Sequence, residues 1–266
     1  MRKIFFFLGI CALAAFNFSS ALWAGTNFAA KKNDRQIRIS PPEKNLRIGE
    51  KLLFDAYWVG IHVGTGSLEV KEIATVSGRE AYHIIAVAET NDFLSKLYPV
   101  RDVVETFVDT QDLYSLEFRK TVKEGFYRAD EKIIYDYASK IGRYESLRNK
   151  SKKEFPLPEK VHDFLSVFYW ARLEPWQVGK SIRTTVNDDE KNWDLELQVL
   201  RTEAKEMKGG KVMDTVVIEP KTSMKGILYN RGRAWVHFST DSQRKPILIF
   251  IQTPFGPITG VLKEDK

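Results

Sequence analysis

The sequence predicts a mainly β protein: a curved antiparallel sheet or partly closed β-barrel, with one short helix packed against its concave face. Apolar and polar residues alternate in short segments that recur about every ten residues, with turn residues between them, as in sandwiches and barrels. Gly64 and Gly66 fall inside one such segment, where glycine favours a bulge or strong curvature. Only one stretch, Val161–Arg172, has convincing helical periodicity.

The N-terminus has the pattern of a secretory signal peptide. Arg2 and Lys3 precede an apolar run, Ile4–Phe18, and small residues follow, with cleavage expected after Ala21 or Ala24. The run is shorter than the ~20 residues of a membrane-spanning helix, and no later stretch is that long. We therefore expect export to the periplasm through a cleavable signal peptide, with no transmembrane span after its removal. An uncleaved N-terminal anchor is the alternative.

We divide the chain into a signal peptide at 1–24, a flexible lead at 25–45 and a single β-rich domain at 46–266. Cys11 is the only cysteine, and the bulky Ile10 before it does not fit a lipoprotein box, so we assign both to the signal peptide. The mature chain then has no disulfide, and its stability must come from a buried core.

The net charge of the mature chain is modest. The sequence holds 41 basic and 35 acidic residues, and removing Arg2 and Lys3 leaves 39 against 35, a net charge of +4. Export argues against nucleic acid as a partner, whereas anionic lipid head groups or lipopolysaccharide phosphates suit basic clusters. Solvated loop charge is the simpler interpretation of those clusters. They lie at Arg148–Lys153 and at Lys205, Lys208 and Lys211.

The first half of the domain is predicted as a series of strands. In Leu52–Trp58 every second residue is apolar and faces the same side. Short turn signals such as Ser77-Gly78 and Glu124-Gly125 separate the strands that follow. A link at Phe93–Val100 and a charged loop at Asn149–Glu154 interrupt the series. The further strands are Ile61–Val70, Glu80–Thr90, Arg101–Thr110, Leu113–Lys123, Phe126–Tyr137 and Lys140–Leu147.

The helix is predicted at Val161–Arg172. Pro156 and Pro158 end strand structure before it, and Asp163 is a candidate N-cap. Arg172 places a cation at the C-terminal end, where it suits the helix dipole; a buried Arg172 would instead anchor an anion. Apolar residues follow the i, i+3, i+4, i+7 rule at Val161, Phe164, Leu165 and Phe168.

Strands resume after the helix, with turns at Gly209-Gly210 and Pro254–Pro257. Asp241 is expected to cap a tight turn through its own backbone and to form a local ion pair with Arg244; a buried Arg244 would instead anchor an anion. The predicted strands are Ser181–Asn187, Trp193–Thr202, Val212–Glu219, Gly226–Tyr229, Arg233–Ser239, Pro246–Thr253 and Thr259–Leu262.

The sequence gives no catalytic site, metal site or cofactor site. Asp163 cannot orient its neighbour His162 toward Ser166, because adjacent residues on a helix point in different directions. The histidines sit singly on different elements, without a second ligand at metal-binding spacing: His62, His83, His162 and His237. No facing carboxylate pair can be chosen among the strand acids, which we interpret as solvated: Asp102, Glu105, Glu117, Asp130 and Glu196.

Aromatic residues are the most unusual feature of the sequence, because they are spread along the chain and crowded on the helix. They either line an apolar cavity between sheet and helix or simply form the core, and core packing is the commoner case. With a cavity, the candidate ligand-binding residues are Trp58, Tyr98, Phe168, Trp170, Arg172 and Trp235.

These motifs together resemble a known bacterial family. They are Phe54-x-x-Tyr57-Trp58-x-Gly60-x-x-x-Gly64, Leu97-Tyr98-x-Val100-x-Asp102, Asp163-x-x-Ser166-x-x-x-x-Trp170-x-Arg172, Trp235-x-x-x-Ser239-x-Asp241-x-x-Arg244-x-Pro246 and the closing Gly256–Leu262. In this order and spacing they are similar to the family called domain of unknown function 3108 (DUF3108), over Leu46–Leu262. The resemblance implies an exported, β-rich cell-envelope protein of Gram-negative bacteria, and it brings no catalytic residues. His162 and Phe164 flank Asp163, where the family often has a proline after the aspartate.

We expect a non-enzymatic periplasmic protein that binds or assembles an apolar or amphiphilic envelope ligand, such as a lipid, between sheet and helix. The first alternative is a module without a pocket, which binds an envelope protein through a strand edge or a surface patch. The second is an enzyme acting on cell-wall or surface polysaccharide, which would need two facing carboxylates with raised pKa.

Overall fold

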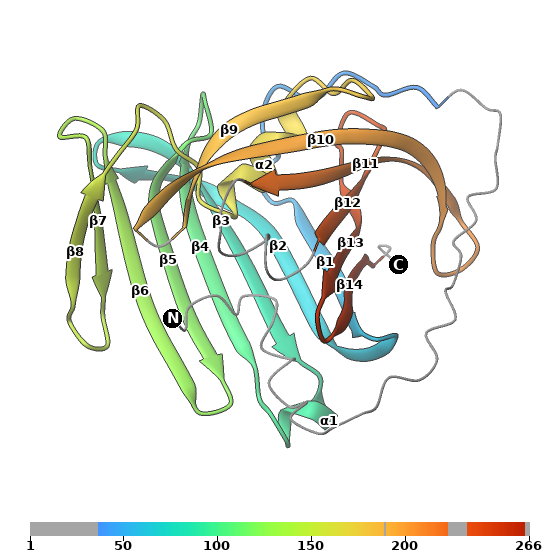
Figure 1. The fold of residues 1–266 in the computed structure, drawn as a ribbon, viewed down its shortest axis with the longest axis horizontal. Helices are drawn as coiled ribbons and strands as arrows, with labels where there is room; N and C mark the ends of the chain where they lie inside the picture. The colour runs from blue at the N-terminus through green and yellow to red at the C-terminus, as the bar shows by residue number, and fades with distance from the viewer. Residues whose placement is uncertain (1–36, 189, 223–232, 264–266) are drawn as a thin grey trace.

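The computed structural model describes residues 37–188, 190–222 and 233–263. The expected signal peptide and the predicted strand Gly226–Tyr229 lie outside these ranges. The described chain forms one 14-stranded antiparallel sheet that curls into an open, barrel-like shell with a helix inside it (Figure 1). This architecture confirms the predicted fold class. No helix within the described ranges is long and apolar enough to cross a membrane.

The first eight strands form a meander in which each strand pairs with the one before it. Their bounds are β1 Lys51–Trp58, β2 Ile61–Val76, β3 Arg79–Thr90, β4 Arg101–Asp109, β5 Ser115–Glu124, β6 Tyr127–Asp136, β7 Ile141–Ser146 and β8 Lys152–Pro156. The prediction of a charged loop at Asn149–Glu154 is therefore wrong at its C-terminal end. β8 is an edge strand, so its charged side chains face solvent, while Phe155 is buried over Gly142.

The last six strands form a second meander. Their bounds are β9 Ser181–Asp188, β10 Lys191–Glu206, β11 Val212–Thr222, β12 Arg233–Ser239, β13 Pro246–Thr253 and β14 Gly256–Leu262. The two meanders meet where β1 pairs with β14, from Phe54 opposite Leu262 to Trp58 opposite Ile258. This seam leaves β8 and β9 as the two edges of the sheet.

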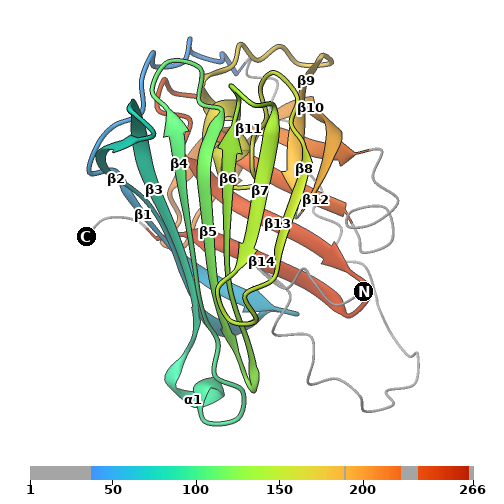
Figure 2. The same cartoon turned by 90° about the vertical axis from the view of Figure 1, so that its left-hand side faces the viewer.

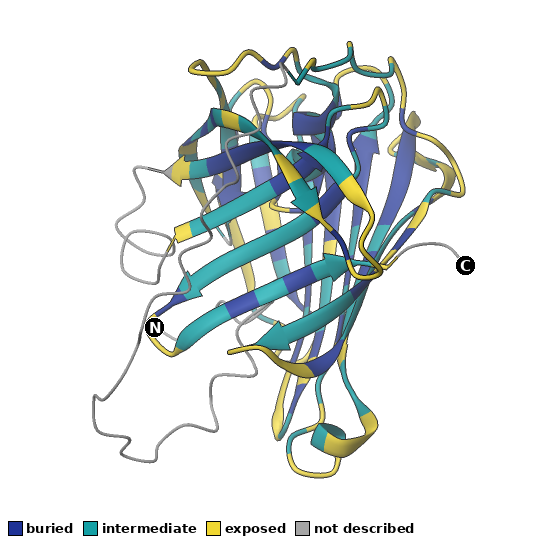
Figure 3. Cartoon of the chain, turned by 90° about the vertical axis from the view of Figure 1, so that its right-hand side faces the viewer, coloured by how far each residue is buried: buried dark blue, intermediate teal, exposed yellow. Residues whose placement is uncertain are grey.

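Strand alternation gives the sheet an inner, apolar face. Buried residues fall on every second position along most of β4 and in β6 and β7, and Figure 3 shows buried residues alternating with less buried ones along several strands. At Gly64 the neighbouring strand lies too close for any side chain. A β-carbon on this residue would lie 2.1 Å from the carbonyl oxygen of Glu89. Gly64 lies where a bulge or strong curvature is predicted. At this point the pairing of β2 with β1 shifts register, between Ala56 and Tyr57 of β1.

The residues that the structure describes form two short helices, α1 (Asp92–Ser95) and α2 (Ser166–Leu173). Helix α2 begins later than the predicted Val161, because the chain before it is held extended. The backbone N–H of His162 donates to the Thr185 carbonyl (3.0 Å), and His162 accepts from the Asn187 N–H (2.7 Å). The residues around His162 thus pair with the exposed edge of β9.

Side chains bridge the opening between the two sheet edges, which Figure 2 shows from the side of β8. The amide of Asn192 donates to the Pro156 carbonyl oxygen at 2.7 Å, and Lys153 pairs with Glu190 at 2.8 Å. The shell is therefore open between β8 and β9, and the chain that precedes α2 and side chains bridge the gap without a continuous ladder of backbone hydrogen bonds.

Two hydrophobic clusters meet at α2. The first lies against β2 through β8 and includes Leu165 and Tyr169, both buried. The second lies against β9 through β12 and includes Ala171 and Trp176. Phe168 packs against both clusters, so α2 is the element that joins the two halves of the core.

Candidate binding cavity

A cavity of about 250 Å³ lies inside the shell, between the sheet and the segment leading into α2. Phe164, Leu165 and Phe168 cover it from the side of the helix. Strands β1, β2, β3, β12, β13 and β14 form the opposite wall, which is largely apolar. Representative wall residues are Phe54, Leu68, Val236, Ile249, Ile251 and Ile258.

Small residues create this space. A β-carbon on Gly66 would lie 3.6 Å from the Val87 carbonyl oxygen, and one on Gly260 would lie 3.7 Å from the β-carbon of Ile249. Both distances are ordinary contacts, so the backbone does not demand glycine at either position. Together with Ala56, Ala86 and Ala88, these glycines leave open a volume that larger side chains would fill.

One end of the cavity carries two buried carboxyl groups, Asp102 of β4 and Glu124 of β5, which are 1% and 2% exposed. Asp102 Oδ1 accepts a hydrogen bond from the Lys123 backbone N–H at 2.9 Å. Glu124 Oε1 is buried and has no hydrogen-bond partner among the described residues. The polar end of the cavity therefore offers an acceptor that the described chain leaves unused.

The two carboxyl groups share a proton. Burial, and then the hydrogen bond to Asp102 and its charge, raise the pKa of Glu124 to about 8. Burial also raises the pKa of Asp102, while hydrogen bonds from Lys123 and from the protonated Glu124 lower it. At neutral pH, Glu124 is thus the protonated partner and donates to an ionised Asp102.

Two neighbours frame this carboxyl pair. Lys120, which forms an ion pair with Glu131 at 2.9 Å, acts on both acids through its charge and lowers the pKa of each. Tyr98 packs against the turn after β5, where a β-carbon on Gly125 would lie 2.5 Å from the Tyr98 ring. Burial, followed by the charges of the pair, raises the pKa of Tyr98.

A second buried acid, Asp163, fixes the segment that covers the cavity. Its Oδ1 accepts from the backbone N–H groups of Leu165 and Ser166, both at 2.8 Å. Its Oδ2 accepts from the hydroxyl groups of Ser115 and Thr106. Asp163 therefore caps the turn that leads into α2 and ties that turn to β4 and β5, whereas the residue directly before the helix is Leu165, which makes no side-chain cap.

The other end of α2 is held by Arg172. Its guanidinium group forms two 2.7 Å hydrogen bonds to the Glu50 carboxylate and donates to the Gln243 carbonyl oxygen at 2.9 Å. Arg172 is 4% exposed. The anion that it binds is thus a side chain of the protein itself, just before β1.

Arg244 is also buried, at 1% exposed, and it binds carbonyl oxygens. Its guanidinium donates to the carbonyls of Arg172, Glu174 and Ser40, and it stacks 4.0 Å from the Trp176 ring. The predicted Asp241 cap is present, since Asp241 Oδ1 accepts from the Arg244 N–H at 3.1 Å. Instead of forming the expected ion pair with Asp241, the Arg244 side chain binds backbone carbonyl oxygens at the C-terminal end of α2.

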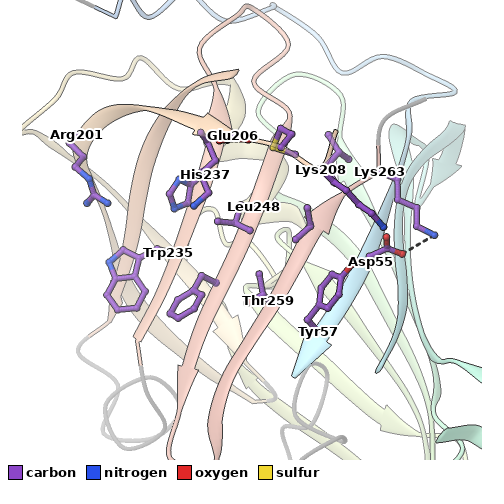
Figure 4. A pocket seen from close by; sticks show the side chains of 15 residues that line it. Asp55, Tyr57, Arg201, Glu206, Lys208, Trp235, His237, Leu248, Thr259 and Lys263 are labelled. Atoms are coloured by element: carbon purple, nitrogen blue, oxygen red, sulfur yellow. Dashed lines mark ion pairs between the residues drawn. The ribbon is translucent and has the colours of Figure 1, made fainter. Parts of the chain in front are cut away.

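A second hollow lies on the outer face of the same strands. It is an open groove of about 1040 Å³ over β1, β12, β13 and β14, beside the bent β10–β11 hairpin (Figure 4). Its floor is apolar and aromatic, and charged residues stand at its rim. Lys263 in this groove pairs with Asp55 at 2.9 Å. Floor residues include Tyr57, Trp235, Leu248, Phe250 and Val261.

Within the described ranges, no three His, Cys, Asp or Glu side chains converge as metal ligands. His162 Nδ1 lies 3.0 Å from the Leu113 carbonyl oxygen, away from Asp163. Burial lowers the pKa of His162 to about 4. His162, Asp163 and Ser166 thus make their contacts within the packed segment that leads into α2.

The structure distributes the six predicted ligand-binding residues over several places. Phe168 lines the cavity, and Tyr98 lies beside its carboxyl end. Trp58 donates to the Phe255 carbonyl at 3.1 Å, and Trp170 packs on the His162 ring, with centroids 4.9 Å apart. Trp235 lies in the outer groove and Arg172 binds Glu50. Ligand binding by these six residues stays a prediction.

Sequence reasoning missed the carboxyl pair. Asp102 was interpreted as a solvated strand acid, and Glu124 was assigned to a turn. A signal was present, because Asp102 shares the inward register of Val104 and Val108. Glu124 likewise shares the register of Val122 on β5.

Comparisons with known proteins identify a family and one solved structure with the same fold. Residues 53–263 match the family described as "Protein of unknown function (DUF3108)". A β-barrel-like protein of domain of unknown function DUF1849 from Brucella abortus superposes with a TM-score of 0.52 at 12% identity, covering 83% of this chain and 98% of that one. A Parabacteroides distasonis protein described as "a putative lipoprotein" gives a TM-score of 0.31 at 10% identity, covering 87% and 100%. No curated protein shows a significant match. The Brucella likeness shows the fold alone.

Proposed function

The chain belongs to the DUF3108 family of proteins of unknown function, and from that premise we propose that it is a non-enzymatic binding protein of the bacterial cell envelope. Its ligand is an apolar or amphiphilic molecule held between the curved sheet and α2. The observation that carries this proposal is the apolar cavity beneath Phe164 and Phe168, with polar groups gathered at one end.

The size of the cavity sets the size of the buried part of the ligand. An apolar cavity of roughly 150 Å³ accepts one benzene molecule. In proportion, a cavity of about 250 Å³ holds roughly ten carbon atoms. The proposed ligand thus buries one short alkyl chain or a small ring system, and Phe168 is the predicted aromatic residue that contacts it.

Location in the periplasm is part of the proposal. It is supported by the signal-peptide pattern of residues 1–24, with its basic start and short apolar run. The single β-rich domain then begins near Leu46, and the mature chain has no cysteine. A cavity protein of this kind would bind its ligand in the aqueous space between the membranes.

The carboxyl pair supports binding more than hydrolysis. Asp102 and Glu124 hydrogen bond directly to each other. Glycosidases place a sugar between their two carboxyl groups, which stand about 5–9.5 Å apart. A directly bonded pair leaves no room for a glycosidic bond between its members.

The outer groove favours a second candidate function, binding of an envelope protein. An aromatic floor containing Tyr57, Trp235 and Phe250 beside a charged rim has the composition of an interaction surface. On this alternative the protein binds its partner through the groove and carries no small ligand.

The test of the proposed function uses the mature protein purified from a Gram-negative periplasm. Native mass spectrometry followed by organic extraction is expected to find a co-purifying amphiphile. Naphthalene, which has ten carbon atoms and is fluorescent, is the matched probe for protein without a ligand. Ala88→Leu fills the cavity and is expected to weaken naphthalene binding about tenfold or more. Ala138→Leu, in the exposed turn after β6, is the control and should bind as the parent does.

The proposal fails if the purified protein carries no amphiphile and does not bind naphthalene. Naphthalene binding that is equally strong in the Ala88→Leu variant would place the binding site elsewhere and would also contradict it. In that case the outer groove becomes the site to examine, by cross-linking envelope proteins to it.

A further inference from the structure

We infer that the Asp102–Glu124 pair is the head-group subsite of the cavity and that it selects an ammonium group over an anionic one. The inference rests on the proposed function and adds the class of ligand. The preferred ligand is a molecule with a short apolar chain or ring that ends in an ammonium group. Carboxylate and phosphate heads are rejected.

The first support is the unused acceptor at the cavity end. Glu124 is 98% buried, lines the cavity and leaves Oε1 without a partner among the described residues. A buried acceptor without a hydrogen bond costs about 1–3 kcal/mol. A ligand that donates a hydrogen bond at this position removes that cost, whereas a carboxylate or phosphate oxygen brings a second acceptor.

The second support is the sign of the charges around the cavity. Its described lining contains three acids, Glu89, Asp102 and Glu124, and no lysine, arginine or histidine. Glu89 pairs with Arg101 at 3.3 Å, near the surface. An anionic head would therefore meet an ionised Asp102 with no cation in the lining, and such like-charge contacts cost several kcal/mol.

The charged groups around the pair leave it with a net negative charge. Lys120 of β5 is the cation whose charge acts on both acids, and its ion pair with Glu131 of β6 offsets that charge. Tyr98 adds no charge at physiological pH, because the ordinary pKa of tyrosine is about 10 and burial raises that of Tyr98 further. With one proton shared between Asp102 and Glu124, the group of Asp102, Glu124, Lys120 and Glu131 carries about one negative charge. An ammonium head neutralises it.

Binding of an ammonium group also displaces the shared proton. A cation beside Glu124 favours its ionised form, so the proton on Glu124 is released to solvent as the ligand binds. An uncharged hydroxyl head makes the same hydrogen bond but does not release the proton. Proton release therefore separates a head group in this subsite from a chain that only occupies the apolar space.

The test compares three ligands with the same ten-carbon chain: decylamine, decan-1-ol and decanoate. Affinities are measured by calorimetry on the unmodified mature protein, below micelle-forming concentrations, at about pH 7.5. We expect decylamine to bind about tenfold or more tightly than decanoate, with decan-1-ol between them. Repeating the decylamine titration in buffers of different ionisation enthalpy should show release of a fraction of a proton up to one proton per ligand.

Variants locate the effect. Glu124→Gln keeps the side-chain shape, the Oε1 acceptor and the charge of Asp102 but removes the titrating group, so proton release should disappear while decylamine should still bind more tightly than decanoate. The control is Glu117→Gln. Glu117 lies on the same strand, pairs with Arg119 and Lys132, and does not line the cavity. This variant should keep the preference of the parent.

The outcomes separate this inference from the proposed function. If decanoate binds as tightly as decylamine, or if Glu124→Gln still releases a proton on binding decylamine, the head-group subsite is wrong while the cavity proposal stands. If none of the three compounds binds and naphthalene does not bind either, both proposals are wrong.

Discussion

Two groups of buried acids on the inner face of the shell differ in how completely they are hydrogen bonded. Asp163 accepts from two hydroxyl groups and two backbone N–H groups, so both of its oxygens have partners. The Asp102–Glu124 pair shares one proton and leaves Glu124 Oε1 unpaired beside an apolar space. All three side chains are 2% exposed or less, so burial alone does not distinguish the two groups.

This difference in hydrogen bonding indicates different roles for Asp163 and for the Asp102–Glu124 pair. A buried acid with every oxygen bonded has no capacity left for a ligand, and its hydrogen bonds stabilise the position of α2. A buried acid with an unused oxygen destabilises the empty protein and gains a partner only from outside the chain. Removing Asp163 should therefore lower the stability of the fold. Removing Glu124 should instead alter ligand binding and the pH dependence of stability.

The largest effect is expected for Asp163→Ala. Four donors, including the hydroxyl groups of Ser115 and Thr106, would lose their acceptor in a buried site. We expect the free energy of unfolding to fall by an amount on the order of 4 kcal/mol, measured by urea denaturation. The exposed Asp92→Ala in α1 is the control and should change stability little. A loss below about 1 kcal/mol would contradict the structural role of Asp163.

The second effect is a pH dependence that belongs to Glu124. Because the pKa of Glu124 rises to about 8 on folding, the native state holds a proton that the unfolded state has lost, and stability must fall as pH rises toward 8. Between about pH 6.5 and 8 we expect a decrease of about 1–2 kcal/mol. Glu124→Gln should flatten this slope. The pKa of His162 and of His237 is lowered by burial to about 4, so both are neutral in the native state, while in the unfolded state they titrate near pH 6.5; they add a smaller rise in stability at the low end of this window, which Glu124→Gln does not remove.

A smaller effect is expected when Glu124 becomes apolar. Glu124→Met removes the unpaired oxygen but also the hydrogen bond that Glu124 donates to the buried Asp102, so the two effects offset each other and stability at about pH 8 should change by about 1 kcal/mol or less. Thermal unfolding of the variant and the parent at that pH measures the change. A loss of several kcal/mol would mean that Glu124 Oε1 has a partner of its own in the folded protein, and the contrast with Asp163 would disappear.

The smallest effect is expected on the outer face. Trp235→Ala opens the groove floor but does not touch the cavity, since Trp235 and Val236 point to opposite sides of β12. Naphthalene affinity should stay within about twofold of the parent, and the loss of stability should stay near 1 kcal/mol. A large loss of naphthalene binding would show that the probe occupies the groove instead.

Much of the fold could be predicted because strand alternation is a local property of the sequence. Most strands lie where period-two patterns and turn signals place them. β8 was missed because an edge strand exposes charged residues, and Lys152–Glu154 therefore has the composition of a loop. The start of α2 was misplaced because the apolar pattern from Val161 is helical in spacing, while hydrogen bonds to β9 hold that part extended.

The polar end of the cavity could not be predicted from local patterns. Asp102 and Glu124 come together through the register of β4 against β5, in which Val103 lies opposite Thr121. That register contains a shift at Phe107 that no turn signal reveals. Aromatic residues were the visible signal, yet most of the cavity wall is built from alanine, glycine and aliphatic side chains.

The seam between β1 and β14 has a consequence for how quickly the protein folds. Each meander can form by successive hairpins between neighbours in the chain, but the seam joins Phe54 to Leu262, about two hundred residues apart. Closing so long a loop is slow, and until it happens β1 and β14 each present a strand edge able to pair with another molecule. A chain truncated before Gly256 lacks β14, so β1 and β13 keep unpaired edges permanently and we expect it to aggregate.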